Sequence, residues 1–321
     1  MPAPSSDARP VLVVITGPTA SGKSALAVEV ARRLGCEILS ADSRQLFRDI
    51  PIGTAAPSPV ELAAVPHHFV GCLGLGDYFS AARYEEEALR LLGQLWNRPG
   101  APRVMVVCGG SMMYVDALLR GIDDIPSISD ETRGYVRRLY EDNGLEGVFA
   151  QLSILDPEYA AVVDPANTRR VMHALEICLQ TGRPYSALRT GEPKPRPFRT
   201  LKFALDLPRE VLFDRINRRV DAMMDAGLVR EARRAFDKAG EEANSLNTVG
   251  YRELLAFFHG RMSLPEAKAR IAKNTRVYAK KQLTWLRRDP SVIWLRDPAT
   301  AADFILAKVN EYLNNSGSSG F

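Results

Sequence analysis

Hydrophobic runs of two kinds alternate along the first part of the chain. Segments typical of buried strands lie at residues 11–16, 37–41, 104–108 and 201–207. Segments with apolar side chains at helical spacing lie between them, from Leu26 to Leu34 and over residues 77–96. Strands that alternate with helices in this way predict an α/β fold, in which a parallel sheet is flanked by helices.

The pattern changes between residues 125 and 199. Strand-like runs stop there, and helical segments are predicted at 130–142, 144–153, 156–163 and 167–181. A Pro-rich connector follows before the strand-like pattern resumes. We therefore predict an all-α subdomain inserted into the α/β core. The predicted parts are a first core segment, 11–124; the helical insertion, 125–199; the completion of the core with basic C-terminal helices, 200–298; and a terminal helix with a flexible tail, 299–321.

The helix predicted over residues 264–288 is strongly basic. Only one acidic residue, Glu266, lies in and just before it, and Tyr278 and Trp285 are interleaved with the cations. The cations are Arg261, Lys268, Arg270, Lys273, Arg276, Lys280, Lys281, Arg287 and Arg288. A basic helix that carries aromatic residues favours contact with a nucleic-acid backbone, and a merely solvated charged face is the alternative.

Composition narrows the class of protein further. The 321 residues carry a net charge of +4, and 46% of them are hydrophobic, which is ordinary for a soluble globular chain. The four cysteines are scattered without metal-ligand or disulfide spacing, and no apolar run approaches membrane-spanning length. We expect a cytoplasmic monomer without membrane contact, with a disordered lead-in over residues 1–10.

The segment after the first strand carries the strongest motif. Residues 17–24, GPTASGKS, satisfy G-x-x-x-x-G-K-[ST], and an apolar-periodic helix follows them. Glycines allow a tight turn whose N–H groups point at an anion held at the helix N-terminus. Lys23 adds a positive charge, and the Ser24 hydroxyl is placed to ligate Mg²⁺. The motif predicts a binding loop for a di- or triphosphate; a chance Gly/Ser-rich turn is the alternative. Its residues are Gly17, Pro18, Thr19, Ala20, Ser21, Gly22, Lys23 and Ser24.

The ends of two other predicted strands bear on the chemistry. Asp42 follows residues 37–41, which places it beside the phosphate loop if the sheet is parallel; a role as a helix cap is the alternative. Residues 104–108 are followed by Gly109, Gly110 and Ser111 rather than by the Asp that helps hold the metal in many ATPases and GTPases. Nucleotide hydrolysis is therefore disfavoured, and the double glycine indicates a backbone that another group approaches closely.

Arginines at two places are candidates for binding anions. Arg215, Arg218 and Arg219 lie three and four residues apart in a long helix predicted over residues 208–236, and we expect them to share a face that suits a diphosphate. Arg169 and Arg170 begin the helix predicted at 167–181 and could contact a large anionic partner. In both cases a solvated surface is the alternative.

Taken in order, the motifs resemble those of the tRNA dimethylallyltransferases, also called tRNA isopentenyltransferases, over nearly the whole chain. The matching segments are residues 17–24, 40–47, 52–58, 65–69, 109–122, 169–182, 215–232, 248–254 and 280–288. The resemblance implies a P-loop NTPase-like core and transfer of the dimethylallyl group of dimethylallyl diphosphate to the exocyclic amine of adenosine 37, beside the tRNA anticodon. It also implies that the helical insertion grips the anticodon stem–loop. The alternatives are an adenylate isopentenyltransferase, a small-molecule P-loop kinase and a non-catalytic P-loop module that binds tRNA.

The resemblance also implies roles for individual residues. Asp42 would be the general base, and Lys23 and Thr19 would assist the departure of pyrophosphate with Mg²⁺ on Ser24. One or more of Arg215, Arg218 and Arg219 would hold the remaining oxygens of the diphosphate. The residues implied to contact tRNA are Asp42, Ser43, Arg44, Gln45, Ser111, Arg133, Arg169, Arg170, Thr248, Val249, Gly250, Tyr251, Arg252, Lys280 and Lys281.

Overall fold

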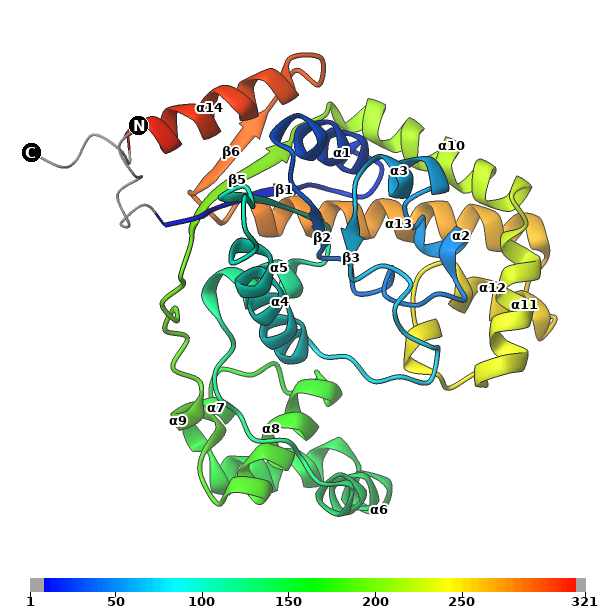
Figure 1. Ribbon diagram of the computed structural model, residues 1–321. Helices are drawn as coiled ribbons and strands as arrows, with labels where there is room; N and C mark the ends of the chain where they lie inside the picture. Colours follow the sequence, from blue (N-terminus) through cyan, green and yellow to red (C-terminus); the bar gives the residue numbers. More distant parts are fainter. Residues whose placement is uncertain (1–8, 316–321) are drawn as a thin grey trace, which may run out of the picture. The chain divides into compact units, whose positions relative to one another are not determined.

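The computed structural model describes residues 9–315 (Figure 1). Most of the predicted lead-in, residues 1–8, and the end of the predicted tail, residues 316–321, lie outside that range. Contacts between Cα atoms divide the chain into two compact units, of which the smaller is Arg120–Pro195.

The larger unit is built on a parallel sheet of six strands in the order β3-β2-β4-β1-β5-β6. The strands are β1 (Val11–Thr16), β2 (Ile38–Ser40), β3 (His67–His68), β4 (Val104–Gly109), β5 (Arg199–Leu205) and β6 (Val292–Leu295). β1 lies at the centre, where Ile15 is in register with Cys108 on β4 and with Phe203 on β5. The predicted α/β fold with a parallel sheet is confirmed. The four strand-like runs correspond to β1, β2, β4 and β5.

Helices cover this sheet and extend beyond it (Figure 1). Those of the larger unit are α1 (Lys23–Leu34), α2 (Pro51–Thr54), α3 (Pro59–Ala64), α4 (Ala81–Trp96), α5 (Met112–Arg120), α10 (Arg209–Asp225), α11 (Leu228–Ala239), α12 (Tyr251–Phe258), α13 (Leu264–Leu286) and α14 (Ala301–Asn315). The prediction of one helix over residues 208–236 is wrong. Gly227, in a left-handed conformation at φ 98°, separates α10 from α11, and the apolar periodicity on both sides of it hid the break.

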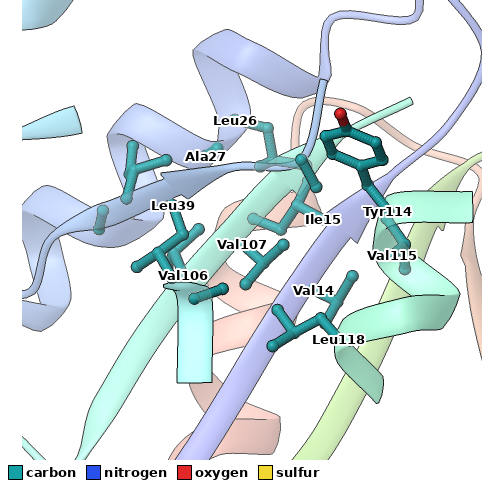
Figure 2. Close-up of a cluster of buried hydrophobic side chains, with 14 of the residues drawn as sticks. Val14, Ile15, Leu26, Ala27, Leu39, Val106, Val107, Tyr114, Val115 and Leu118 are labelled. Atoms are coloured by element: carbon teal, nitrogen blue, oxygen red, sulfur yellow. The ribbon is translucent and has the colours of Figure 1, made fainter. Parts of the chain in front are cut away.

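The core of the larger unit lies where the central strands meet α1 and α5. Figure 2 shows Val14 and Val107 from β1 and β4 among Leu26 of α1 and Leu118 of α5. All five residues from Val11 to Ile15 are completely buried. A strand buried on both faces reads as a continuous apolar run, which is why the pattern at residues 11–16 was legible in the sequence.

The smaller unit is entirely helical. It contains α6 (Asp130–Leu155), α7 (Pro157–Ala160), α8 (Thr168–Thr181) and α9 (Tyr185–Leu188), and it has its own buried cluster around Val148, Leu152 and Val171. α6 is kinked at Gly144, which has non-helical angles and coincides with the break predicted between 142 and 144. The unit starts and ends earlier than the predicted segment 125–199, because the Lys194 N–H bonds the Arg120 carbonyl at 2.7 Å and Arg199 already pairs with β1.

None of the helices in residues 9–315 combines the length and the apolar character that a membrane crossing requires.

Candidate active site

A cavity of about 370 Å³ opens at the carboxyl ends of β1, β2 and β4. This is the edge of a parallel sheet at which ligands commonly bind. Its walls come from the phosphate loop, from the loop after β2, from the ends of α2 and α12, and from one face each of α10 and α13. The lining residues that the sequence predicted are Thr19, Lys23, Ser24, Asp42, Ser43, Arg44, Gln45, Ser111, Arg219, Thr248, Val249, Gly250 and Arg252.

The phosphate loop has the backbone geometry that its motif predicts. Gly22 is left-handed at φ 97° and immediately precedes α1, so the first N–H groups of the helix are exposed to the loop. Lys23 is partly buried and its Nζ donates to the Pro18 carbonyl at 3.3 Å. Burial lowers the pKa of Lys23, and Asp42 is among the groups that oppose this shift. The loop thus presents a partly dehydrated cation, whose interaction with an anion is strengthened by the low local dielectric.

The loop after β2 holds Asp42 beside the phosphate loop. One carboxylate oxygen of Asp42 accepts the Arg44 N–H at 2.9 Å, which fixes the turn. The Ser43 N–H donates to the Ser111 hydroxyl at 2.9 Å and ties this turn to the end of β4. These two bonds hold the turn that places Asp42 in the cavity lining. The bond to the Arg44 N–H also resembles the helix-capping role that was the alternative for Asp42.

The double glycine at the end of β4 is explained by close approaches within the protein. A Cβ atom at Gly109 would lie 2.2 Å from the Ala41 carbonyl oxygen. One at Gly110 would lie 2.5 Å from the Gln282 amide nitrogen. The predicted close approach is therefore present, and the approaching groups are the loop before Asp42 and the helix α13.

The three arginines of α10 have different surroundings. Arg219 lines the cavity, and burial lowers its pKa while Asp42 opposes this shift. Arg215 donates to the Ser21 carbonyl at 3.1 Å and so braces the phosphate loop from outside. Arg218 is exposed and pairs with Asp214 one turn earlier. Arg218 does not line the cavity, since it lies about 100° around the helix from Arg219 and turns toward Asp214.

Several residues predicted to contact tRNA instead form hydrogen bonds within the protein. The Arg44 guanidinium donates to the carbonyls of Asn244 and Ser245 at 2.7 and 3.2 Å, and so anchors the segment before α12. The Gln45 amide donates to the Ala55 carbonyl at 2.9 Å. Tyr251 is completely buried, does not line the cavity, and donates to Glu231 at 2.6 Å. These side chains shape the cavity wall, and Tyr251 is too deep to contact a ligand.

The other predicted tRNA contacts lie away from the cavity lining. Lys280 and Lys281 are exposed on α13, and the Lys280 ammonium lies over the Phe213 ring at 5.7 Å. Arg133, Arg169 and Arg170 are exposed on α6 and α8 in the smaller unit.

One face of α13 lines the cavity and was missed by the sequence analysis. Its residues Ile271, Thr275, Tyr278 and Gln282 are spaced four, three and four positions apart, as one helical face requires. Burial, reinforced by Asp42, raises the pKa of Tyr278 to about 12, so the phenol stays protonated at neutral pH. The sequence did contain a sign of this cavity face, because uncharged residues recur at helical spacing on one side of an otherwise basic helix.

Comparisons with known proteins agree on one family. A sequence model of the family described as IPP transferase matches residues 45–289. The protein named tRNA dimethylallyltransferase 1 of Bacteroides thetaiotaomicron is 50% identical over 285 residues, which cover 89% of this chain and 91% of that protein.

Two solved structures are similar over most of the chain. The tRNA isopentenylpyrophosphate transferase of Bacillus halodurans has a TM-score of 0.70 at 33% identity, covering 96% of this chain and 98% of its own. A eukaryotic dimethylallyltransferase described as acting on tRNA has a TM-score of 0.81 at 25% identity, covering 95% of this chain and 80% of its own. The chain therefore belongs to the IPP transferase family.

Proposed function

We propose that the chain is a tRNA dimethylallyltransferase. It transfers the dimethylallyl group from dimethylallyl diphosphate to the exocyclic amine of adenosine 37, next to the anticodon, and yields N6-dimethylallyladenosine and pyrophosphate. The observation that supports this most directly is that Thr19, Lys23 and Ser24 of the phosphate loop line the same cavity as Asp42. The names of the relatives and of the similar structures point to the same reaction.

The cavity suits a diphosphate leaving group. Lys23 and Arg219 are both partly buried cations that line it, and the N-terminus of α1 adds oriented N–H groups. These groups would stabilise the charge that develops on the departing pyrophosphate, with Thr19 adding its hydroxyl. Desolvation lowers the pKa values of Lys23 and Arg219, and a bound anion would offset that cost because an opposite charge favours the protonated form.

Mg²⁺ fits the same place. The Ser24 hydroxyl lines the cavity and would be one ligand, since Mg²⁺ prefers oxygen ligands. In the described part of the chain, no group of three or more His, Cys, Asp or Glu side chains is able to hold an ion. Oxygens of the diphosphate and water would therefore complete the coordination, as is common for Mg²⁺. The ion would supply charge neutralisation on the leaving group.

Asp42 would act as the general base. The adenosine nitrogen attacks the dimethylallyl carbon that bears the diphosphate, the bond from that carbon to oxygen breaks, and the amine proton passes to the Asp42 carboxylate. Its turn is fixed by Arg44 N–H and by Ser111, so the carboxylate is held in place before substrate binds. The target base must leave its stack to reach this cavity, as other base-modifying enzymes require.

The exposed cations of α13 supply a contact surface for the tRNA backbone, and the helical unit Arg120–Pro195 would contact the anticodon stem–loop. We further propose that the protein works as a monomer in the cytoplasm.

Transfer of label tests the proposed function. The purified chain is incubated with Mg²⁺, radiolabelled dimethylallyl diphosphate and unmodified tRNA, with adenosine monophosphate in a parallel reaction. The matched control is the same tRNA with guanosine at position 37. Label in the adenosine-37 tRNA alone is the expected result. Label mainly in the mononucleotide would instead identify an adenylate isopentenyltransferase, and ATP hydrolysis without any transfer would contradict prenyl transfer altogether.

A further inference from the structure

The Gln282 side chain bridges two loops of the cavity from α13. It is only 2% exposed, although it is a polar residue on a strongly basic helix. Its Oε1 accepts the Thr19 N–H at 2.9 Å, and its Nε2 donates to the Gly110 carbonyl at 2.8 Å. Only one orientation of the amide satisfies both bonds, because one partner is a donor and the other an acceptor. Both ends of this side chain are therefore specified.

The bond to Thr19 has a consequence for the phosphate loop. A backbone N–H has one proton, and that of Thr19 is directed to Gln282 instead of to the anion site. Thr19 nevertheless lines the cavity. Its contribution to a diphosphate is therefore left to its side chain, and Gln282 fixes the backbone from which that side chain extends.

The bond to Gly110 connects Gln282 to the side of the cavity that carries Asp42. Gly110 directly precedes Ser111, whose hydroxyl accepts the N–H of Ser43, the residue after Asp42. The contact is tight, since a Cβ at Gly110 would lie 2.5 Å from Nε2. The hydroxyl of Tyr278 also donates to the Gly110 carbonyl, at 3.5 Å. Two residues of the same helical face thus support this loop.

We propose that Gln282 is a positioning residue, which sets the separation between the phosphate loop and the loop that carries Asp42. The proposal rests on the proposed function only for the identity of the reaction. An active site of this kind depends on donors and acceptors held in place before reaction, and a buried side chain bonded at both ends provides such a support.

Gln282→Met tests this with little change of side-chain volume, and it removes both hydrogen bonds. Leu286→Met is the matched control, because Leu286 is equally buried on the same helix but packs with Ala204 and Val292, away from the cavity. For both variants we would measure the Kd for pyrophosphate by calorimetry, the Kd for tRNA, and kcat and KM for dimethylallyl diphosphate.

We expect Gln282→Met to weaken pyrophosphate binding and to lower kcat/KM for dimethylallyl diphosphate by about tenfold or more, because the Thr19 N–H loses its partner and the Gly110 carbonyl keeps only the longer bond from Tyr278. The Kd for tRNA should stay within about twofold of wild type, since the exposed cations of α13 are untouched. Gly110→Ala should have the same effects on pyrophosphate binding and on kcat/KM, because the added Cβ would displace the Gln282 amide from its hydrogen bond to residue 110.

Two results would overturn the proposal. One is a Gln282→Met enzyme in which pyrophosphate affinity and kinetic constants match those of Leu286→Met. The other is a variant in which only the fraction of active enzyme falls, with unchanged KM and Kd values, because that is the signature of lower stability alone. If wild-type protein transfers no prenyl group, the proposed function fails, while the pyrophosphate affinities of the variants still decide whether Gln282 positions the loop.

Discussion

Two faces of the helix α13 differ in their contacts: one forms hydrogen bonds within the protein at the cavity, and the other carries solvent-exposed lysines. On the cavity face, the Gln282 amide and the Tyr278 hydroxyl both donate hydrogen bonds to the Gly110 carbonyl. Gln282 also accepts the N–H of Thr19 in the phosphate loop. Outside the cavity face, Lys273 and Lys281 are exposed to solvent. The first face is fixed within the protein before any ligand arrives, whereas the second keeps its charges available.

This difference matches what the two proposed substrates require. Stabilising a departing diphosphate depends on groups that need no rearrangement during the reaction. Binding an RNA backbone depends on cations that replace condensed counterions, and it is strongly sensitive to salt. The faces should therefore respond differently to mutation and to ionic strength.

The largest effect is expected at Asp42. Asp42→Asn keeps the size of the side chain and an oxygen that accepts the Arg44 N–H, but it removes the base. We expect kcat to fall by about 10²- to 10⁴-fold, with tRNA affinity nearly unchanged. Single-turnover transfer and a filter-binding assay measure the two quantities. Unchanged kcat would assign the proton transfer to another group.

The neighbouring arginines Arg219 and Arg218 form a second test, since only Arg219 reaches the cavity. Arg219→Gln should raise KM for dimethylallyl diphosphate by about tenfold or more, because a charge-assisted contact to the diphosphate is lost. Arg218→Gln serves as the matched control and should stay within about twofold of wild type, since its partner Asp214 is exposed. Equal effects of the two substitutions on steady-state kinetics would contradict the geometry of α10.

A smaller effect is expected on the exposed face of α13. Lys273→Gln and Lys281→Gln should each reduce the slope of log Kd for tRNA against log salt concentration by about 1 if the lysine contacts a phosphate. KM for dimethylallyl diphosphate should not change. Lys268→Gln is the control, because Lys268 pairs with Asp221 on α10 at 2.8 Å. A salt titration in which all three variants behave like wild type would remove this face from the tRNA-binding surface.

The smallest effect concerns the anchor at the end of α13. Asp289 follows the helix and pairs with Lys202 of β5 at 2.8 Å. Burial alone would raise the pKa of Asp289, but the bonds from Lys202 and Ser291 lower it to about 2. Because the folded-state pKa lies below the usual value, this stabilisation is complete above that value and is lost as pH falls toward 2.

Denaturant unfolding between pH 5 and pH 2 measures that contribution. Asp289→Asn should remove a pH-dependent part of the unfolding free energy of about 1 kcal/mol, which is modest because the pair is partly exposed to solvent. Identical pH profiles for the variant and wild type would show that the anchor does not depend on the charge of Asp289.

Local patterns predicted the parts of the site that are contiguous in sequence. The phosphate loop, Asp42 after its strand and the charge of α13 were all legible because each depends on a few neighbouring residues. Contacts between distant segments were not. Gln282 meets Thr19 across 263 positions, and Arg44 meets Asn244 across 200, so neither pairing has a periodicity that a sequence reveals.

Helix geometry explains the remaining errors. Apolar residues keep their helical spacing on both sides of Gly227, so the spacing does not reveal the break there. Only the left-handed backbone of Gly227 marks the end of one helix and the start of the next. Tyr251 has a polar hydroxyl in a segment beside the cavity, yet its partner Glu231 belongs to α11 and draws the ring inward. The direction in which the Tyr251 side chain points is therefore set by a partner in another helix, which the local sequence pattern does not show.

If the two faces of α13 serve different substrates, paired substitutions on them should separate the binding of dimethylallyl diphosphate from that of tRNA. Gln282→Met and Lys281→Gln would be compared with wild type in the same salt series, with the Kd for tRNA and the KM for dimethylallyl diphosphate determined for each. We expect a crossed pattern: Gln282→Met changes only the KM for dimethylallyl diphosphate, and Lys281→Gln changes only the Kd for tRNA and its salt dependence. Two variants that alter both constants together would contradict the separation of the faces.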